Sequence, residues 1–415
     1  MSEIKENVVL TIVPNKKFKN TIVSIRFLNK LEKIHATERA LLSMIMMDRC
    51  EKYPTKQQMS NELDYLYGAV ISGKPLGYGQ SQVIEIKCNV LNEQYVSEQL
   101  TKSQFEFLHE IIYRPLLTEE VLAEAKKNLF EALSRVEDTP SQYSIQEAFR
   151  IAGEGHPLGI SSTGNIQEIE DVSLAGMKEA HRRLLEEDNI TITVIGDIDE
   201  AEIKEYVEEF FPFKSRSLKV QTHYSFVPNE LKERTMSKSV DQTNLTMIYN
   251  TQTQITDSEF WALRVGNALF GQLPISYLFQ EVREKRSLAY SIYSQSVAFD
   301  SILYVNTGIQ EKALDQVLDL IEEQRKRIAT GDFSDDLLAT AKKMLISAIH
   351  SNMDSSNALV NLIYQNTLLN ETDTVVDIEH KIQAVEKEKI QEVFSRFILN
   401  TVFTIKKEDV NGKNS

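Results

Sequence analysis

The sequence has very little cysteine and no long apolar run. Cys50 and Cys88 are the only cysteines among 415 residues, and they do not form a CxxC pair. This usage fits a reducing compartment and provides no thiolate site for a metal ion. No segment approaches the ~20 continuous apolar residues that a membrane span requires, and the first residues lack the pattern of a secretory signal. We therefore expect a cytoplasmic protein without a membrane partner.

Positive charge is also scarce. The sequence has 46 Lys and Arg against 61 Asp and Glu, a formal net charge of −15, which argues against a nucleic-acid partner bound by phosphate neutralisation. The complete Rossmann glycine fingerprint, the P-loop and the GxSxG motif are absent, so neither a nucleotide cofactor nor a serine hydrolase is indicated. The remaining composition, with 42% hydrophobic and 26% charged residues, is that of a globular protein of two or more domains.

The apolar patterning predicts two α+β halves of similar size. We expect an N-terminal domain at 1–212, a polar and basic linker at 213–228, and a C-terminal domain at 229–415. Strands and helices follow in roughly the same order in both halves, which predicts duplicated domains. Thr55 is the expected N-cap of the second helix, and Gly68 marks its end. The predicted strands are 8–13, 21–27, 83–88, 190–195, 245–249, 289–294, 302–308 and 401–406, and the predicted helices are 37–47, 55–68, 93–112, 118–137, 173–187, 200–211, 258–270, 276–286, 311–329, 334–350 and 375–397.

The clearest local motif is LFQEVREKRSLAYS at 278–291. It places Arg283 and Tyr290 seven residues apart, and a guanidinium and a phenol aimed at developing negative charge stabilise an oxyanion. The residues alone favour a simpler interpretation. In it, Arg283, Lys285 and Arg286 complement a helix dipole, and Tyr290 is an ordinary strand residue.

This segment resembles the second domain of the pitrilysin/insulinase/mitochondrial processing peptidase family, the inverzincins whose zinc motif is HxxEH. Residues 156–159 (HPLG), 164–166 (GNI) and 195–198 (IGDI) resemble further segments of that family, so the resemblance covers nearly the whole chain. It implies two homologous processing-peptidase-like α+β domains, each an antiparallel-rich sheet covered by helices, which form half of a clamshell. It also implies that Arg283 and Tyr290 bind the scissile carbonyl of a substrate opposite a zinc site.

The zinc motif itself is missing from this sequence. HxxEH works because helical positions i and i+4 present two imidazoles on one face, while i+3 offers the carboxylate that activates the zinc-bound water. Counting back from Tyr53-Pro54, which resembles the segment after that helix, places Ala40, Ser43 and Met44 at the three functional positions. Alanine cannot bind zinc, and a thioether is a poor ligand for it. We therefore expect no metal in this chain and an apolar helix that fills a core.

Two further acidic motifs resemble parts of a metal site. Glu124 and Glu131 stand seven apart on one helix, as the distal acids of the family do, and Glu131 matches the third zinc ligand. One carboxylate without imidazoles cannot hold catalytic zinc, so we interpret Glu131 as a remnant. His35 and Glu38 form HxxE, but Arg39 follows in place of a histidine and would repel a cation. Neither motif predicts a metal centre.

The resemblance implies a zinc-less, non-catalytic subunit of a heterodimeric zinc metallopeptidase. Arg283 and Tyr290 would then act in trans at the zinc of a homologous, HxxEH-bearing partner, on a peptide or unfolded polypeptide. Within the family the resemblance is to zinc-less bacterial members associated with 5-aminopentanol modification of elongation factor P. The family presents an edge strand that captures peptides by β-addition, and its place here falls on Val70, Ile71, Ser72 and Gly73; a plain structural strand fits these residues equally.

Two alternatives from other classes stay open. One is a non-enzymatic peptide-binding or scaffold protein, homodimeric or without a peptidase partner, in a protein-modification pathway. The other is a hydrolase with a rebuilt metal site. A neighbouring gene for a similar chain with intact HxxEH would favour the heterodimer, and metal analysis of the pure protein would identify a rebuilt site.

Overall fold

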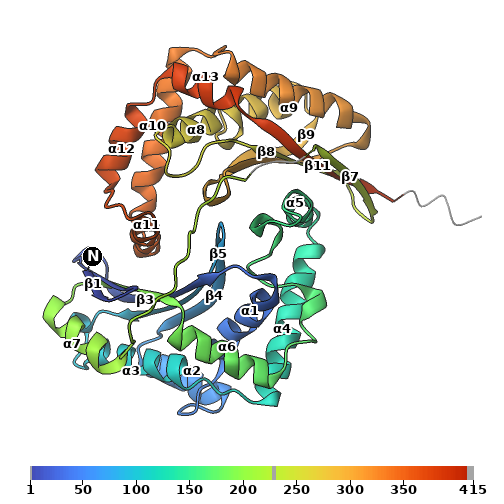
Figure 1. Ribbon diagram of the computed structural model, residues 1–415. Helices are drawn as coiled ribbons and strands as arrows, with labels where there is room; N and C mark the ends of the chain where they lie inside the picture. The colour runs from blue at the N-terminus through green and yellow to red at the C-terminus, as the bar shows by residue number, and fades with distance from the viewer. Residues whose placement is uncertain (1, 227–229, 409–415) are drawn as a thin grey trace, which may run out of the picture. The chain divides into compact units, whose positions relative to one another are not determined.

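The protein, represented by a computed structural model, is described over residues 2–226 and 230–408 (Figure 1). Its chain forms two compact units, each assembled from separate stretches of sequence: unit 1 comprises 1–134, 160–221 and 353–372, and unit 2 comprises 135–159, 222–352 and 373–415. The predicted domains and linker include residues 1, 227–229 and 409–415, which lie outside the described residues, and their boundaries stay predictions. No helix in the described part of the chain is long and apolar enough to cross a membrane.

Unit 1 is built on a mixed six-stranded sheet in the order β1-β2-β6-β3-β5-β4. β2 and β6 are parallel, and the other neighbouring strands are antiparallel. The strands are β1 (Ser2–Lys5), β2 (Val8–Pro14), β3 (Asn20–Lys30), β4 (Val70–Tyr78), β5 (Ser81–Leu91) and β6 (Asn189–Gly196), and the helices are α1 (Lys33–Asp48), α2 (Lys56–Tyr65), α3 (Leu100–Tyr113), most of α4 (Glu119–Glu137), α6 (Leu174–Glu186), α7 (Glu200–Phe210) and α11 (Ser356–Leu369).

Unit 2 has a mixed five-stranded sheet in the order β7-β11-β8-β10-β9. β11 and β7 are parallel, and the other neighbouring strands are antiparallel. The strands are β7 (Lys232–Lys238), β8 (Thr243–Asn250), β9 (Ala289–Val297), β10 (Ile302–Ile309) and β11 (Ile398–Lys407), and the helices are α5 (Pro140–Ala152), α8 (Phe260–Asn267), α9 (Leu314–Ala329), α10 (Asp335–Asn352), α12 (Val375–Gln383) and α13 (Lys387–Ser395). Short helical turns complete the two units at η1 (Glu93–Tyr95), η2 (Pro157–Gly159), η3 (Ile166–Glu168), η4 (Ala268–Gln272), η5 (Phe279–Glu284), η6 (Ala298–Asp300) and η7 (Glu311–Ala313).

The two sheets repeat one topology. If β1 is set aside, each sheet has five strands whose spatial order, numbered along the chain, is first, fifth, second, fourth and third. In each sheet the first strand is parallel to the fifth, and the third strand, β4 or β9, ends the sheet. The predicted fold class, with two antiparallel-rich sheets covered by helices, is confirmed.

Strand β3 shows why unit 1 needs a helix from the C-terminal half of the sequence. Successive side chains of a strand point to opposite faces, and Val23, Ile25 and Phe27 join the main core of unit 1. On the other face Ile22 packs with Val360 of α11. Because helices cover both faces, β3 is buried over nearly its full length.

A buried ion pair lies beneath α11. The Arg26 guanidinium donates from Nε and Nη2 to Oε1 of Glu85, at 2.9 and 2.5 Å, and both side chains are 1% exposed. The guanidinium also lies 4.3 Å from the centre of the Tyr364 ring on α11. Burial opposes ionisation of Glu85, but the charge and hydrogen bonds of Arg26, helped by nearby lysines, hold the pKa of Glu85 below its ordinary value.

Two predicted helices are wrong as single elements. The helix predicted over 93–112 is divided into η1 and α3 because the Glu93 carboxylate accepts the backbone N–H of Thr101, near the start of α3, at 3.0 Å. The helix predicted over 375–397 ends at Gln383 and resumes at Lys387, with Val385 buried between. Helices α5 and α11 and strands β1 and β7 were not predicted. The Thr55 N-cap of α2 is confirmed, with a full capping box to Gln58.

Candidate functional site

Arg283 lies in η5, a short π-helical segment. Such segments are rare and frequently occur at functional sites. The neighbouring Lys285 and Arg286 both pair with the buried carboxylate of Glu281, each at 2.6 Å, and these hydrogen bonds lower the pKa of Glu281. Arg283 instead stacks on the Phe279 ring, with its guanidinium 4.5 Å from the ring centre. Its side chain is 38% exposed and lies 3.4 Å from the carboxylate of Glu284, which is 49% exposed. The guanidinium of Arg283 therefore remains accessible to solvent.

Tyr290 lies at a bulge in β9, the edge strand of the unit 2 sheet. Ser291 pairs with Gly308 and Ala289 pairs with Ile309, so Tyr290 is the extra residue between them. Bulges reorient side chains and are common beside active sites. The ring is 80% exposed, and its hydroxyl has no hydrogen-bond partner among the described residues. Arg283 and Tyr290 lie on consecutive elements, η5 and β9. Ser287, which lies between these elements, has a φ of +51°.

The predicted motif positions lie on α1 and differ in burial. Ala40 is 1% exposed and Ser43 is fully buried. Both face the core, and the Ser43 hydroxyl donates to the Ala40 carbonyl at 2.7 Å. Met44 is partly buried against that core and also lines a pocket. Whether these positions correspond to the family motif stays a prediction.

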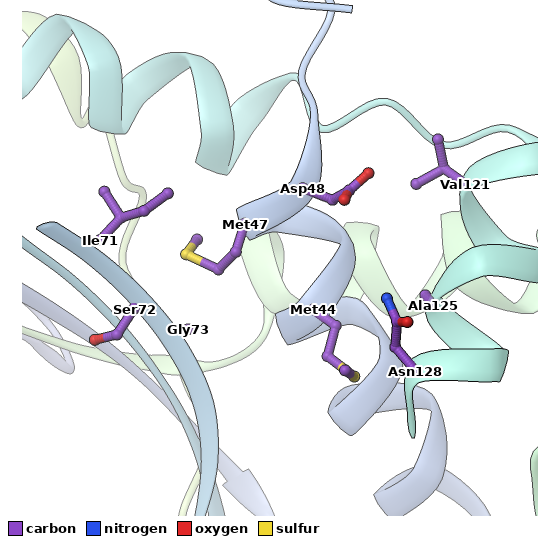
Figure 2. Close-up of a pocket in the computed structure, with 9 residues that line it drawn as sticks. All are labelled: Met44, Met47, Asp48, Ile71, Ser72, Gly73, Val121, Ala125 and Asn128. Atoms are coloured by element: carbon purple, nitrogen blue, oxygen red, sulfur yellow. The ribbon is translucent and has the colours of Figure 1, made fainter. Parts of the chain in front are cut away.

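That pocket has a volume of about 370 Å³ and lies between α1, β4 and α4 (Figure 2). From α1 it receives Met44, Met47 and Asp48, which have the i, i+3, i+4 spacing of HxxEH one helical turn after the predicted positions. The other lining residues are Ile71, Ser72 and Gly73 of β4 and Val121, Ala125 and Asn128 of α4.

The pocket gathers part of the predicted site and adds residues that sequence reasoning missed. Of the predicted edge-strand residues, Ile71, Ser72 and Gly73 line it, whereas Val70 does not and is 64% exposed. Met47, Asp48 and Asn128 were not predicted from the sequence as site residues. The helical spacing of Met44, Met47 and Asp48 was the signal in the sequence that could have identified the first two.

The two acids of α4 that resemble the distal zinc acids do not line the pocket. Glu131 is exposed to solvent. Glu124 pairs with Lys56 at 2.5 Å and with Arg49 at 2.9 Å, and the hydrogen bonds from these two cations lower the pKa of Glu124. These ion pairs join α4 to the end of α1 and the start of α2, and so hold two walls of the pocket together.

The HxxE residues His35 and Glu38 both lie within contact of an arginine. Arg183 of α6 donates to the Glu38 carboxylate at 2.8 Å and approaches Nδ1 of His35 at 3.3 Å, while His35 and Glu38 lie 3.1 Å apart. A guanidinium in this position opposes a bound cation. Over residues 2–226 and 230–408 no group of three or more His, Cys, Asp or Glu side chains is placed to hold a metal ion.

Neither cysteine is a candidate nucleophile. Both are buried, and burial raises the pKa of each thiol, to about 12 for Cys88. A reactive cysteine requires the thiolate, which a low pKa favours.

Comparison with known proteins gives a consistent result. Residues 171–345 match the family described as the peptidase M16 inactive domain. The chain is 27% identical over 403 residues, 95% of each protein, to the probable inactive metalloprotease YmfF of Bacillus subtilis. It is 21% identical over 286 residues, 68% of this chain and 69% of the other, to the uncharacterized zinc protease YmxG of the same organism. A conserved protein from Enterococcus faecalis V583, whose crystal structure is known, is 28% identical in sequence to this chain. The two structures superpose with a TM-score of 0.93, and the match covers 99% of each chain.

These matches support the resemblance drawn from the sequence. The structural match extends over both units and confirms the fold. Residues 171–345 match the M16 inactive domain, the whole chain is similar to a probable inactive metalloprotease, and no group of side chains in the described residues is placed to hold a metal ion.

Proposed function

Because this chain is an M16 homologue without a metal site in its described part, we propose that it is the non-catalytic subunit of a heterodimeric zinc metallopeptidase. Its partner is a homologous chain that carries HxxEH and the zinc ion. The observation that carries the proposal is the contrast between two elements of one chain. In the described residues, helix α1 belongs to no cluster of side chains that could hold a metal ion, whereas η5 and β9 present Arg283 and Tyr290 to solvent without a structural task for the Tyr290 hydroxyl.

Arg283 and Tyr290 suit the stabilisation of an oxyanion. During hydrolysis of a peptide bond, negative charge develops on the carbonyl oxygen, and donors fixed in advance lower the barrier. The guanidinium provides a permanent positive charge and the phenol a single directed donor. Zinc in the partner supplies the nucleophile, and this chain supplies the two donors and part of the wall around the substrate.

Peptide capture is assigned to the free edge of β4. Among residues 2–226 and 230–408, this strand ends the unit 1 sheet and pairs with β5 alone. The backbone groups on its other side are available to an extended polypeptide, which is the general mode of β-addition. Val70, Ile71, Ser72 and Gly73 form the part of this edge that begins beside the pocket.

The comparisons agree with a paired arrangement. Bacillus subtilis has both a relative named as a probable inactive metalloprotease and a relative named as an uncharacterized zinc protease, so both kinds of relative are found in one organism. An association with elongation factor P modification rests on the sequence resemblance alone and belongs to this proposal.

A peptide-binding or scaffold protein without a peptidase partner is the second candidate. The free edge of β4 and the adjoining pocket favour it, because neither requires a metal ion to bind a polypeptide. In that case the protein, alone or as a homodimer, holds its ligand for another enzyme of a protein-modification pathway.

Mixing the chain with an HxxEH-bearing homologue from the same organism separates the two candidates. A stable pair should bury more than ~1,200 Å² and survive gel filtration at micromolar concentration, and the mixture should cleave unfolded polypeptide. Separate elution at every salt concentration, with and without added peptide, would contradict the heterodimer and favour the scaffold.

A further inference from the structure

We propose that Lys74 and Lys87 form a binding site for one anionic group, a carboxylate or a phosphate, on the face of the unit 1 sheet against which α11 packs. Such a group comes either from an acidic residue of a polypeptide or from a small free anion. The inference goes beyond the proposed function, because it depends only on charges within unit 1. It requires neither a partner chain, nor a zinc ion, nor the capture of peptides at the edge of β4.

The register of three strands gathers three cations around a single acid. Arg26 of β3 and Lys74 of β4 both stand opposite Glu85 of β5, so the three side chains form one row across the sheet. Lys87 follows Glu85 by two residues and therefore points to the same face. The ammonium nitrogens of Lys74 and Lys87 lie 3.6 and 3.9 Å from Oε2 of Glu85. The two lysines thus converge on one oxygen atom.

The charge of Glu85 is already engaged by Arg26. The guanidinium donates twice to Oε1 of Glu85, at 2.9 and 2.5 Å, and the Ser24 hydroxyl donates to the same oxygen at 3.2 Å. The distances from Lys74 and Lys87 to Oε2 exceed that of a hydrogen bond, and in the described part of the chain neither ammonium group has a hydrogen-bond partner. Three formal positive charges therefore face one negative charge.

The covering helix does not supply the missing negative charge. Helix α11 lies against Arg26 through the Tyr364 ring, and its sequence contains no charged residue. Lys87 is only 18% exposed, and its burial, together with the positive charges of Lys74 and Arg26, lowers the pKa of Lys87 against the effect of Glu85. A bound anion would favour the charged form of Lys87.

The two lysines suit an anion with several oxygen atoms. Each ammonium group is a compact charge with three N–H donors, and hydrogen bonds between ionised groups are stronger than neutral ones. The Lys74 side chain is 50% exposed, so a ligand can reach it from solvent. A neutral group would leave the excess charge in place, and a cationic group would add to it.

Phosphate tests the site on the full chain. Urea unfolding is followed in sodium phosphate and in sodium chloride of equal ionic strength, so that the general screening of charge is matched. An anion that binds only the folded site stabilises unit 1 by mass action. Phosphate should therefore raise the urea midpoint of unit 1 more than that of unit 2, whereas its general exclusion from protein surfaces raises both midpoints.

Three lysine variants locate the effect. Lys87→Gln removes one of the two ammonium groups and should abolish the additional shift of unit 1 in phosphate. Lys127 lies on α4 and is exposed, so Lys127→Gln removes the same charge elsewhere in unit 1 and should retain the shift. Lys74→Gln, at a half-exposed position, repeats the test if Lys87→Gln fails to fold by circular dichroism.

A matched pair of peptides distinguishes the two sources of the anion. The probes are capped, fluorescently labelled nine-residue peptides of one host sequence with Glu or Gln at the centre, and fluorescence anisotropy measures their affinity for the full chain. If a polypeptide supplies the anionic group, the Glu peptide should bind about tenfold more tightly than the Gln peptide, the gain expected from hydrogen bonds to a charged group. Lys87→Gln should remove this difference.

The outcomes separate the inference from the proposed function. A phosphate shift that Lys87→Gln abolishes, with equal affinities for the two peptides, supports the site and assigns it to a free anion. The inference is overturned if phosphate shifts both transitions alike and the two peptides bind equally, or if Lys87→Gln and Lys127→Gln respond identically. None of these results bears on the heterodimer, which the mixing experiment tests separately.

Discussion

Replacing Glu85 by alanine should strongly destabilise unit 1. Glu85 and Arg26 are both 1% exposed, and Glu85→Ala leaves the guanidinium buried beneath α11 without its counter-charge. Removing one partner of a buried ion pair typically costs about 3–5 kcal/mol. In this variant Arg26 would keep its hydrogen bond to Asn361 and its contact with the Tyr364 ring, but no acid would neutralise its charge. We therefore expect the cost to lie within that range.

Urea unfolding measures this effect. Because the chain forms two units, we expect two unfolding transitions. The curve is fitted with one transition for each unit, and Glu85→Ala should shift only the transition of unit 1. The double variant Arg26→Met/Glu85→Leu removes both charges and should recover most of the loss, since apolar replacement of a buried pair is often neutral or stabilising. Glu170→Ala breaks an exposed pair with Lys126 and serves as a control without measurable change. A shift below about 1 kcal/mol for Glu85→Ala, or a double variant no more stable than Glu85→Ala, would refute the reasoning.

The same pair gives unit 1 an acid sensitivity of known sign. The folded-state pKa of Glu85 lies below its ordinary value of 4.5, so the unfolded chain takes up the proton first. The contribution of the pair is therefore complete above pH 4.5 and is lost as the pH falls through the lower folded-state pKa. Unit 1 of the wild type should lose stability more steeply in this acid range than the double variant, and parallel pH profiles would contradict the assignment.

Three further predictions concern the site and its chemistry. The purified chain should contain no stoichiometric zinc by metal analysis, and about one zinc per chain, removable with loss of peptidase activity, would contradict this. Tyr290→Phe should lower kcat of the assembled enzyme by about 10²–10³-fold, because one oxyanion donor is lost. The urea midpoint of the variant should stay unchanged because the hydroxyl has no partner in the described structure. Unchanged turnover in the assembled variant would make the tyrosine structural. Cys50 and Cys88 should react with a thiol reagent only when urea unfolds unit 1, because burial raises both thiol pKa values; fast labelling of the native protein would overturn this prediction.

Local patterns predicted the elements of the fold better than their assembly. The apolar run at 21–27 and the Thr55 N-cap depend on neighbours in sequence, and both predicted elements are present in the structure. The position of α11 depends on contacts between Val360, Tyr364 and strands more than 150 residues earlier in the chain, which no local pattern encodes. The burial of Arg26 and Glu85 was missed for the same reason, because their alternate face looks solvent-exposed until α11 covers it.

For the candidate site, too, the spacing along the sequence was predicted, whereas the contacts made only in the fold were not. The Arg283–Tyr290 spacing is visible in the sequence, but the bulge that makes Tyr290 an unpaired, exposed residue arises from its register with β10. The pocket was missed because its lining comes from α1, β4 and α4, which are brought together only by the fold. Met44 is the one predicted motif position that lines it, beside Met47 and Asp48.

Titration of a zinc-bearing homologue with this chain tests the central claim most directly. The rate of cleavage of an unfolded polypeptide is measured as increasing amounts of this chain are added to a fixed amount of the homologue. The account predicts no cleavage by this chain alone and a rate that rises to a plateau at one chain of each kind. A homologue whose rate does not depend on this chain, under conditions in which the substrate is cleaved, would contradict it.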